Sequence, residues 1–354
     1  MPLVAHNDLP SFNRLSSEGI KVLDPQMAQH QDIRELHIGL LNMMPDAALA
    51  ATERQFFRLI GESNPIAQFY VHPFTLEELP RSAAARTYIE QYYDSFESLK
   101  EQGLDGLIIT GANVSGPELS TQAFWEPLKQ VSQWAYENVT STLYSCLATH
   151  AAMEFHYGIK RQPQDQKVWG VFEHYLVDRH HPLVNDVNTR FNVPHSRWNE
   201  VCSEDFIQAG LKILVKSDQD FVHLATSEDG FRKVFFQGHP EYDTISLLKE
   251  YKRDLLLAQS DSDDKVPPFP ENYLGIFEKA VLNEYRFRSN PSVTEAGEQL
   301  VFPEALLKDK INNTWHDTAV EVVGNWIGLI YQLTHKERKI PFMDGIDPDN
   351  PLGL

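Results

Sequence analysis

A single cysteine, Cys146, lies where the character of the sequence changes. Residues 140–145 (TSTLYS) are mostly β-branched or apolar and are typical of a buried strand, whereas residues 147–152 (LATHAA) favour a helix. The sulfur is therefore predicted to lie in the turn between a strand and a helix. A cysteine at a helix N-terminus gains thiolate character from the helix dipole and from a nearby imidazole, so Cys146 is a candidate nucleophile.

The segment GHPEYD at residues 238–243 could supply the base that a nucleophilic thiol needs. It directly follows the apolar run VFF, so His239 and Glu241 are also predicted at the end of a strand. If two strand ends meet over one cleft, His239 could activate Cys146 while Glu241 holds the imidazole in the useful tautomer. Each residue also has an ordinary structural explanation, and the residues alone leave both roles open. Cys202 has no such neighbourhood and is predicted to be structural.

The sequence contains no recognised metal-binding or phosphate-binding motif. The 14 histidines include the pair His180 and His181, but adjacent residues of an extended chain point to opposite faces. No cluster of His, Cys or Asp has a zinc-type spacing. Gly103, Gly111 and Gly116 form no phosphate-binding fingerprint. We therefore predict no metal site and no bound cofactor.

Two compact polar and aromatic segments, residues 167–174 and 194–198, lie between strand-like runs. They are interpreted as solvated loops in preference to binding loops, since loops serve both purposes. Arg253 lies in a charged helical pattern and by default is a solvated charge. An arginine there could instead bind a carboxylate with two hydrogen bonds.

Strands and helices alternate in the first part of the chain. This alternation predicts an α/β fold with a doubly wound, mostly parallel sheet flanked by helices, which binds ligands at the carboxyl ends of its strands. The predicted strands are residues 36–45, 67–71, 106–111 and 140–145, and the predicted helices are residues 52–60, 84–100 and 125–138.

The rest of the chain is less regular. Three strand-like runs, residues 211–215, 222–226 and 234–237, are spaced as in hairpins and suggest antiparallel members of the same sheet. We expect residues 1–35 to form a polar, irregular N-terminal arm, residues 36–334 a single α/β domain, and residues 335–354 a C-terminal tail. Within the domain, residues 261–312 are predicted to form a long excursion and residues 315–333 a helix.

Composition limits the partners and the compartment. The 354 residues are 42% hydrophobic, as in a folded protein, and 31 basic against 50 acidic side chains give a formal charge of −19. Such a charge disfavours nucleic acid and anionic membranes as partners. The two cysteines are too few for a disulfide framework, and no signal peptide or membrane span of about 18 apolar residues is recognisable. We expect a cytoplasmic protein.

The chain resembles the homoserine O-acyltransferase family, whose members transfer a succinyl or acetyl group to the homoserine hydroxyl in methionine biosynthesis. The similarity extends from about residue 36 to residue 334. It rests on LNMMP at 41–45, TERQFFRLIG at 52–61, DGLIITGANV at 105–114, VTSTLYSC at 139–146, YGI at 157–159, GVFEH at 170–174, PHSR at 194–197, GHPEYD at 238–243 and NNTWHDTAVEVVGNW at 312–326.

The resemblance implies a class I glutamine-amidotransferase-like fold, a homodimer, and a catalytic triad of Cys146, His239 and Glu241. It also implies ping-pong chemistry with acyl-CoA and L-homoserine as substrates and no bound cofactor. In that chemistry the thiolate accepts the acyl group, and His239 then deprotonates the homoserine hydroxyl. Backbone N–H groups near Val114 and Leu147 would hold the oxyanion.

Further site residues follow from the same resemblance. The positions of Lys167, Ser196 and Arg253 contact substrate in the family, and Arg253 suits the amino-acid carboxylate. Glu173 and His174 match a Glu-His pair of the family that is expected to shape the cleft.

The chain departs from the family pattern at several positions. Leu147 replaces a tryptophan, His150 a glutamine and Asn113 a proline, and residues 46–48 (DAA) stand where relatives carry lysines that are expected to contact the coenzyme phosphates.

Ser115 occupies the position at which the family has glutamate for acetyl transfer or glycine for succinyl transfer. Serine would not repel a succinyl carboxylate, so succinyl-CoA is the favoured donor. Alternatives are acetyl-CoA as the donor and serine as the acceptor. Two alternative hypotheses assign the protein a function of another class. It could be a glutamine amidotransferase or hydrolase, or a catalytically inactive binding protein on the same scaffold.

Overall fold

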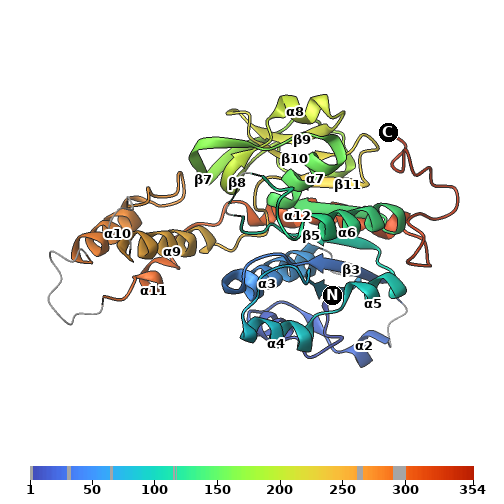
Figure 1. Cartoon of the computed structure of the whole chain (residues 1–354), viewed down its shortest axis with the longest axis horizontal. Helices are drawn as coiled ribbons and strands as arrows, with labels where there is room; N and C mark the ends of the chain where they lie inside the picture. Colours follow the sequence, from blue (N-terminus) through green and yellow to red (C-terminus); the bar gives the residue numbers. More distant parts are fainter. Residues whose placement is uncertain are drawn as a thin grey trace.

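One mixed β-sheet runs through the whole molecule (Figure 1). The computed structural model describes residues 3–29, 33–63, 67–114, 116, 118–260, 266–289 and 300–354. In these residues eleven strands form a single sheet in the order β2-β1-β4-β3-β5-β6-β11-β10-β9-β7-β8.

The first seven strands in this order run parallel to their neighbours. They are β2 (Val22–Leu23), β1 (Leu3–Val4), β4 (Gln68–Phe74), β3 (Glu35–Leu41), β5 (Gly106–Ile109), β6 (Ser141–Ser145) and β11 (Lys233–Phe236). The remaining four pair antiparallel and are β10 (Val222–Thr226), β9 (Lys212–Ser217), β7 (Gln162–Leu176) and β8 (Arg190–Glu200). The predicted antiparallel members around residues 211–237 are confirmed.

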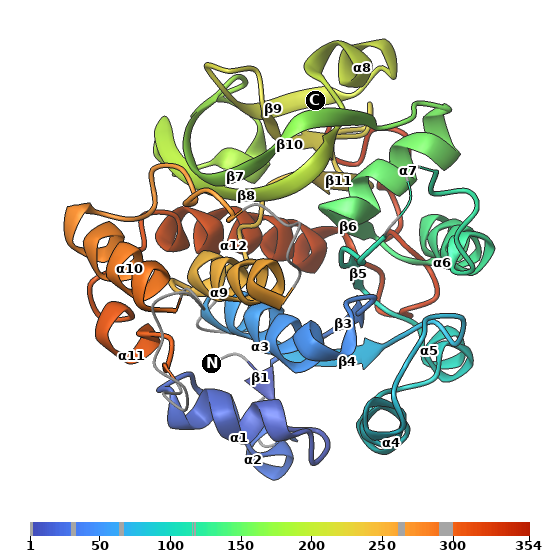
Figure 2. The same cartoon turned by 60° about the vertical axis from the view of Figure 1, so that its left-hand side comes forward.

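Helices bury both faces of the parallel part, as the apolar strands require. On one face α1 (Pro10–Ser17), α3 (Asp46–Ser63) and α12 (His316–Leu333) pack into one core, and Figure 2 shows α3 and α12 on this side. On the other face α5 (Phe96–Gln102), α6 (Trp125–Asn138), α7 (Leu147–Tyr157) and α8 (Ser203–Gln208) pack into a second core. The predicted doubly wound α/β fold is confirmed.

The prediction that the N-terminal residues are irregular is wrong for those that the structure describes. Residues 3–29 contain β1, α1, β2 and α2 (Pro25–Gln29), and Leu3 pairs with Phe69 at the edge of the parallel sheet. Strands of two residues are too short to show a period in the sequence.

The helix predicted at residues 84–100 is two helices, α4 (Ala83–Tyr92) and α5. The chain starts a new helix at Ser95, whose side chain accepts the Ser98 N–H.

The two segments predicted to be solvated loops are strands. Residues 167–174 belong to β7 and residues 194–198 to β8, and these two strands form a long antiparallel hairpin. Pro194 hid the pattern because proline is uncommon in strands, but β8 is the edge of the sheet, where a missing N–H is tolerated. This hairpin carries Lys167 and Ser196.

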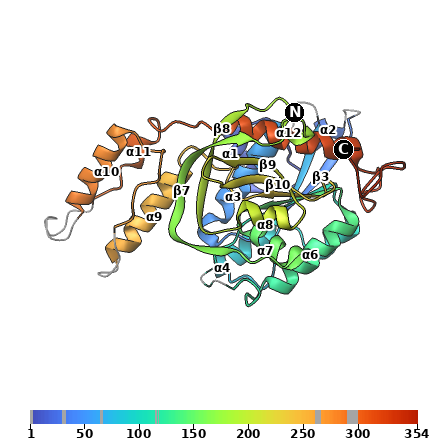
Figure 3. The same cartoon turned by 90° about the horizontal axis from the view of Figure 1, so that it is seen from above.

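The segment after β11 leaves the body of the molecule as a helical projection, which Figures 1 and 3 both show. It contains α9 (Ser246–Ser260), α10 (Ile276–Arg288) and α11 (Glu304–Leu307). These helices share a small apolar core with Trp169 of β7, built around Tyr251, Leu282 and Phe302. Part of the predicted excursion at 261–312, namely residues 261–265 and 290–299, lies outside the described residues.

The C-terminal residues pack on the body. Phe342 belongs to the core that contains α12, and the Thr140 hydroxyl donates a hydrogen bond to the Pro341 carbonyl at 2.5 Å. The division of the chain into an arm, one domain and a tail stays a prediction. None of the helices in the described ranges is both long and apolar enough to cross a bilayer.

Gly170 joins the projection to the sheet. Val171 N–H donates to the Glu271 carbonyl, and Glu271 N–H donates to the Trp169 carbonyl, each at 2.9 Å. Gly170 has φ +148°, and a Cβ there would lie 2.3 Å from the Glu271 carbonyl oxygen. Only glycine allows the two backbones to approach this closely.

We predict that Gly170→Ala lowers the free energy of unfolding by about 2 kcal/mol or more, because the added methyl group overlaps a backbone that cannot move aside. Chemical denaturation measures this loss, and limited proteolysis should show earlier cleavage of the projection. The control is Gly328→Ala in α12. There an added Cβ would meet no atom of another segment within 4 Å, so stability should stay equal or rise slightly. Equal stability of both variants would contradict the docking role of Gly170.

Candidate functional site

Cys146 lies in a sharp turn between β6 and α7. Its backbone has φ 53° and ψ −111°, an unfavourable conformation for a residue other than glycine, and such strain is common at functional sites. The turn is held in place because Cys146 N–H donates to the Phe236 carbonyl at 2.7 Å. The Thr149 hydroxyl bonds to the carbonyls of Tyr144 and Phe236. The predicted position of the sulfur between a strand and a helix is confirmed.

His239 and Glu241 follow β11, which is the strand next to β6 in the sheet. Ser145 pairs with Phe236, so the two strands end side by side. His239 Nδ1 lies 2.8 Å from Glu241 Oε1, and both side chains are buried. The backbone N–H of His239 donates to the Pro194 carbonyl at 2.8 Å, which fixes the loop. The two strand ends therefore bring Cys146, His239 and Glu241 into one site.

The electrostatic surroundings favour the charged form of His239. Burial on its own would lower the pKa of His239, but the negative charges of Cys146 and Glu241, together with the hydrogen bond to Glu241, hold the pKa well above its ordinary value. In the described part of the chain, His239 Nε2 is buried and makes no regular hydrogen bond. Catalytic hydrogen bonds are often long without substrate, so a small movement would complete the contact with sulfur.

A second polar cluster lies next to His239 and is centred on Glu250 of α9. The Glu250 carboxylate accepts hydrogen bonds from the Ser196 hydroxyl at 2.6 Å and the Tyr242 hydroxyl at 2.5 Å, and Lys167 Nζ lies 3.3 Å away. The Tyr242 ring stacks on the His239 ring with 4.2 Å between centroids. The structure thus brings Lys167 and Ser196, from β7 and β8, to one carboxylate.

Glu250 is ionised although it is largely buried. Burial raises the pKa of Glu250, but the charge of Lys167, the hydrogen bonds from Ser196 and Tyr242, and the charge of His239 bring that pKa below its ordinary value. The sequence analysis missed this residue. A usable signal was present, because Glu250 lies beside the apolar helical face that contains Leu247, Leu248, Tyr251 and Leu255.

Arg253 lies on the same helix but outside this hydrogen-bonded cluster. Its Nε donates to the Asp254 carboxylate at 2.8 Å, and its side chain is 60% exposed. Surface ion pairs of this kind are weak, so the guanidinium can exchange its partner. The structure therefore places Arg253 near the predicted substrate contacts without joining it to them.

The backbone groups predicted to hold an oxyanion come from two segments. Leu147 is the first residue of α7, where an N–H has no acceptor within the helix. A Cβ added to Gly111 would lie 3.7 Å from the Leu147 nitrogen, so the segment after β5 reaches this turn. Val114 lies further along this segment, and its role stays a prediction. Ser115, predicted to select the acyl group, lies outside the described residues.

The Glu-His pair is divided between two environments, which corrects the expectation for Glu173. The Glu173 side chain is exposed and forms an ion pair with Arg190 at 2.6 Å, so it does not line the cleft. His174 is fully buried and its Nε2 lies 3.1 Å from His195 Nε2. Successive residues of a strand point to opposite faces, which explains the difference.

Two departures from the family pattern have structural partners. His150 Nε2 lies 2.9 Å from Gln237 Oε1 in the core beneath α7. Asp46, where relatives carry lysine, accepts the Ser82 N–H at 2.8 Å and lies 3.3 Å from an Arg81 nitrogen.

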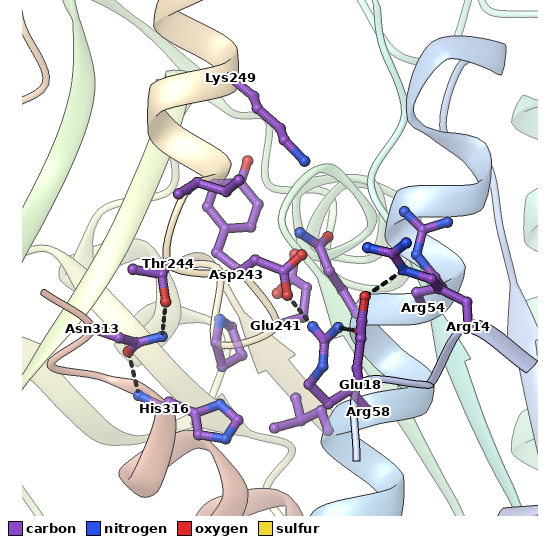
Figure 4. A pocket seen from close by; sticks show the side chains of 15 residues that line it. Arg14, Glu18, Arg54, Arg58, Glu241, Asp243, Thr244, Lys249, Asn313 and His316 are labelled. Carbon is purple, nitrogen blue, oxygen red and sulfur yellow. Dashed lines mark hydrogen bonds and ion pairs between the residues drawn. The ribbon is translucent and has the colours of Figure 1, made fainter. Parts of the chain in front are cut away.

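A pocket of about 420 Å³ adjoins the triad on the side of Glu241 (Figure 4). Arg58 crosses it and is neutralised by two carboxylates. Arg54 of α3 and Lys249 of α9 have no ion-pair partner in the ranges that the structure covers. The pocket therefore offers free positive charge in a chain whose formal charge is −19.

Comparison with known proteins relates the entire chain to one family. The homoserine O-succinyltransferase family model matches residues 2–336. A homoserine O-succinyltransferase from Allochromatium vinosum is 61% identical over 354 residues, covering 100% of this chain and 99% of that protein. One from Thiobacillus denitrificans is 62% identical over 354 residues and covers 100% of both chains. A solved glutamine amidotransferase from Thermotoga maritima has a TM-score of 0.46 at 9% identity, over 84% of this chain and 98% of that one.

We predict that Glu241→Gln lowers the pKa of His239, because the substitution removes a negative charge that stabilises the imidazolium. An NMR titration of histidine-labelled protein measures the change, with the signal assigned by its loss in His239→Asn. Glu173→Gln is the control, since that exposed carboxylate lies on the other face of its strand. An unchanged pKa in Glu241→Gln would contradict the proposed contact.

Proposed function

Because the chain belongs to the homoserine O-succinyltransferase family, we propose that it transfers a succinyl group from succinyl-CoA to the hydroxyl of L-homoserine in methionine biosynthesis. The mechanism is supported by one observation. Cys146 and the hydrogen-bonded residues His239 and Glu241 lie together at the ends of neighbouring strands. We assign Cys146 as the nucleophile, His239 as the acid and base, and Glu241 as the residue that orients His239.

In the first half-reaction the Cys146 thiolate attacks the carbonyl carbon of succinyl-CoA. The N–H groups of Leu147 and Val114 would hold the charge that develops on the carbonyl oxygen, each contributing about 3 kcal/mol in the transition state. The bond to the CoA sulfur then breaks, and His239 gives its proton to the departing thiolate. The succinyl group remains on Cys146, so one thioester replaces another with little change in free energy.

In the second half-reaction the homoserine hydroxyl gives its proton to His239 as its oxygen attacks the Cys146 thioester. The bond from carbon to the Cys146 sulfur breaks, and the sulfur leaves as a thiolate. His239 is then protonated again, which restores the charged pair of the free enzyme. The two substrates react in turn, as ping-pong kinetics require.

The cluster around Glu250 is suited to the amino-acid part of homoserine. A buried, ionised carboxylate beside His239 offers a partner for the substrate ammonium group. Lys167 and Ser196 fix the position of that carboxylate and can also contact the substrate. Arg253, on the same helix, can leave Asp254 and bind the substrate carboxylate with two hydrogen bonds.

The pocket beside Glu241 is suited to the phosphate groups of the coenzyme. Arg54 and Lys249 carry its free positive charge, and the lysines that relatives carry after LNxMP are absent here. Phosphates bind strongly to such groups. A selector role of Ser115 for the acyl group and the homodimer remain predictions.

We expect succinyl-CoA to add one succinyl group to Cys146, and addition of L-homoserine to remove it. Intact-mass spectrometry of the protein measures both steps, and succinyl-CoA should label faster than acetyl-CoA. Cys146→Ala should abolish the label, whereas Cys202→Ala should retain it because Cys202 lies at the start of α8, outside this site. Absence of any label would contradict the mechanism, and ammonia release from glutamine without CoA would instead favour an amidotransferase.

Two neighbouring residues of α9 should affect different substrates. Glu250→Gln should lower kcat/KM for homoserine by about 10- to 100-fold, because it removes a charge-assisted hydrogen bond. Lys249→Gln should raise KM for succinyl-CoA by about three- to tenfold, as expected for an exposed charge contact. Steady-state kinetics with each substrate varied in turn separates the two effects.

Glu284→Gln on the exposed side of α10 is the control for both variants and should leave all constants unchanged. If Glu250→Gln altered only the succinyl-CoA step, the assignment of Glu250 to homoserine would be wrong.

A further inference from the structure

A second group of side chains with metal-binding chemistry lies where the N-terminal segment joins the sheet beside β4. His6 follows β1, His72 lies in β4, and Asp94 lies between α4 and α5. One nitrogen or oxygen atom from each of the three falls within 4.8 Å of the others. The group shares no residue with the acyl-transfer site.

His6 has a ring nitrogen that lacks a partner. Its Nδ1 lies 3.2 Å from the Val4 carbonyl, which can only accept, so Nδ1 carries the proton and Nε2 presents a lone pair. Nε2 is buried and makes no hydrogen bond in the described parts of the chain. A buried acceptor without a partner is unfavourable, and a bound cation would offset that cost.

His72 has the arrangement expected of a metal ligand with outer support. Its Nδ1 lies 2.9 Å from Asp94 Oδ2, shorter than the about 3.3–3.6 Å that separates two ligand atoms of a tetrahedral site when each lies about 2.0–2.2 Å from zinc, so a small outward movement of the two side chains would admit the ion. Its other nitrogen, Nε2, lies 2.9 Å from His37 Nδ1, and His37 Nε2 lies 3.4 Å from Glu35. Metal-bound histidines usually donate their second N–H to such a partner.

Burial favours the neutral form of the His6 ring, in which a ring nitrogen can bind a cation, and also that of the His37 ring. Burial, followed by the charge of His72, lowers the pKa of His6 to about 4, and burial followed by the same charge lowers the pKa of His37 to about 2. A hydrogen-bonded network alone would explain the contacts of His72 with Asp94 and His37. It would leave the buried Nε2 of His6 unexplained.

We propose that His6, His72 and Asp94 bind a divalent cation of the zinc class, with His37 as the outer partner of His72. Two imidazole nitrogens and one carboxylate oxygen suit Zn²⁺, Co²⁺ or Ni²⁺, and water completes the coordination. The ion joins the N-terminal segment to β4 and to the turn before α5. Its effect is on stability, because a ligand that binds only the folded state raises the free energy of unfolding. The proposal does not rest on the proposed function.

The test measures Zn²⁺ and Co²⁺ binding to chelator-treated protein in which both cysteines are replaced by alanine. Calorimetry should give about one ion per chain, bound Co²⁺ should show visible absorption, and saturation with Zn²⁺ should raise Tm. His37→Leu should weaken binding by roughly 10- to 100-fold, as for an outer partner. His6→Leu and Asp94→Asn should weaken it further.

His180→Leu is the matched control, because this exposed histidine lies outside the group, and it should bind as the parent does. Asp94→Asn keeps the shape of the side chain and serves as the second ligand variant if His6→Leu fails to fold. Absence of saturable binding to the parent would overturn the proposal. Equal affinity of the parent and Asp94→Asn would overturn it as well.

Discussion

The parallel pairing of β6 with β11 is the constraint on which the candidate site depends. These strands are distant in sequence, yet their register places Ser145 opposite Phe236, so that Cys146 and His239 emerge from adjacent strand ends. The hydrogen bond from Cys146 N–H to the Phe236 carbonyl ties the strained turn directly to the neighbouring strand. A shift of one residue would reverse the faces of β11 and move the imidazole away from the sulfur.

The same sheet positions the second half of the site through its antiparallel edge. The β7–β8 hairpin brings Lys167 and Ser196 to the first turns of α9. There the Glu250 carboxylate accepts hydrogen bonds from both side chains. Trp169 of β7 packs on Tyr251 of this helix, and the close backbone contact between Gly170 and Glu271 holds the rest of the projection against β7. The proposed substrate contacts are separated along the chain and therefore depend on the docking of the projection against the edge of the sheet.

Sequence reasoning predicted that Cys146, His239 and Glu241 lie at strand ends because each follows a run of apolar residues that stands out locally. It missed β7 and β8, whose stability comes from pairing with each other and with β9 despite Pro194. It also missed Glu250, whose place beside an apolar helical face was a usable signal but whose hydrogen-bond partners only the tertiary contacts reveal. The group of His6, His72 and Asp94 was out of reach for a related reason: three separate segments supply it, so no motif spacing exists to be recognised.

The charged groups around Cys146 and His239 differ in sign: carboxylates lie near the imidazole, and guanidinium groups lie near the sulfur. The imidazolium of His239 lies between the carboxylates of Glu241 and Glu250, and both interact with it favourably. On the other side, burial lowers the pKa values of Arg161 and Arg197, and the negative charge of Cys146 opposes that effect in both. Because these charges are fixed by the fold, they favour the imidazolium form of His239 before substrate arrives. Under the proposed mechanism, attack by the Cys146 sulfur would then require little reorganisation of its surroundings.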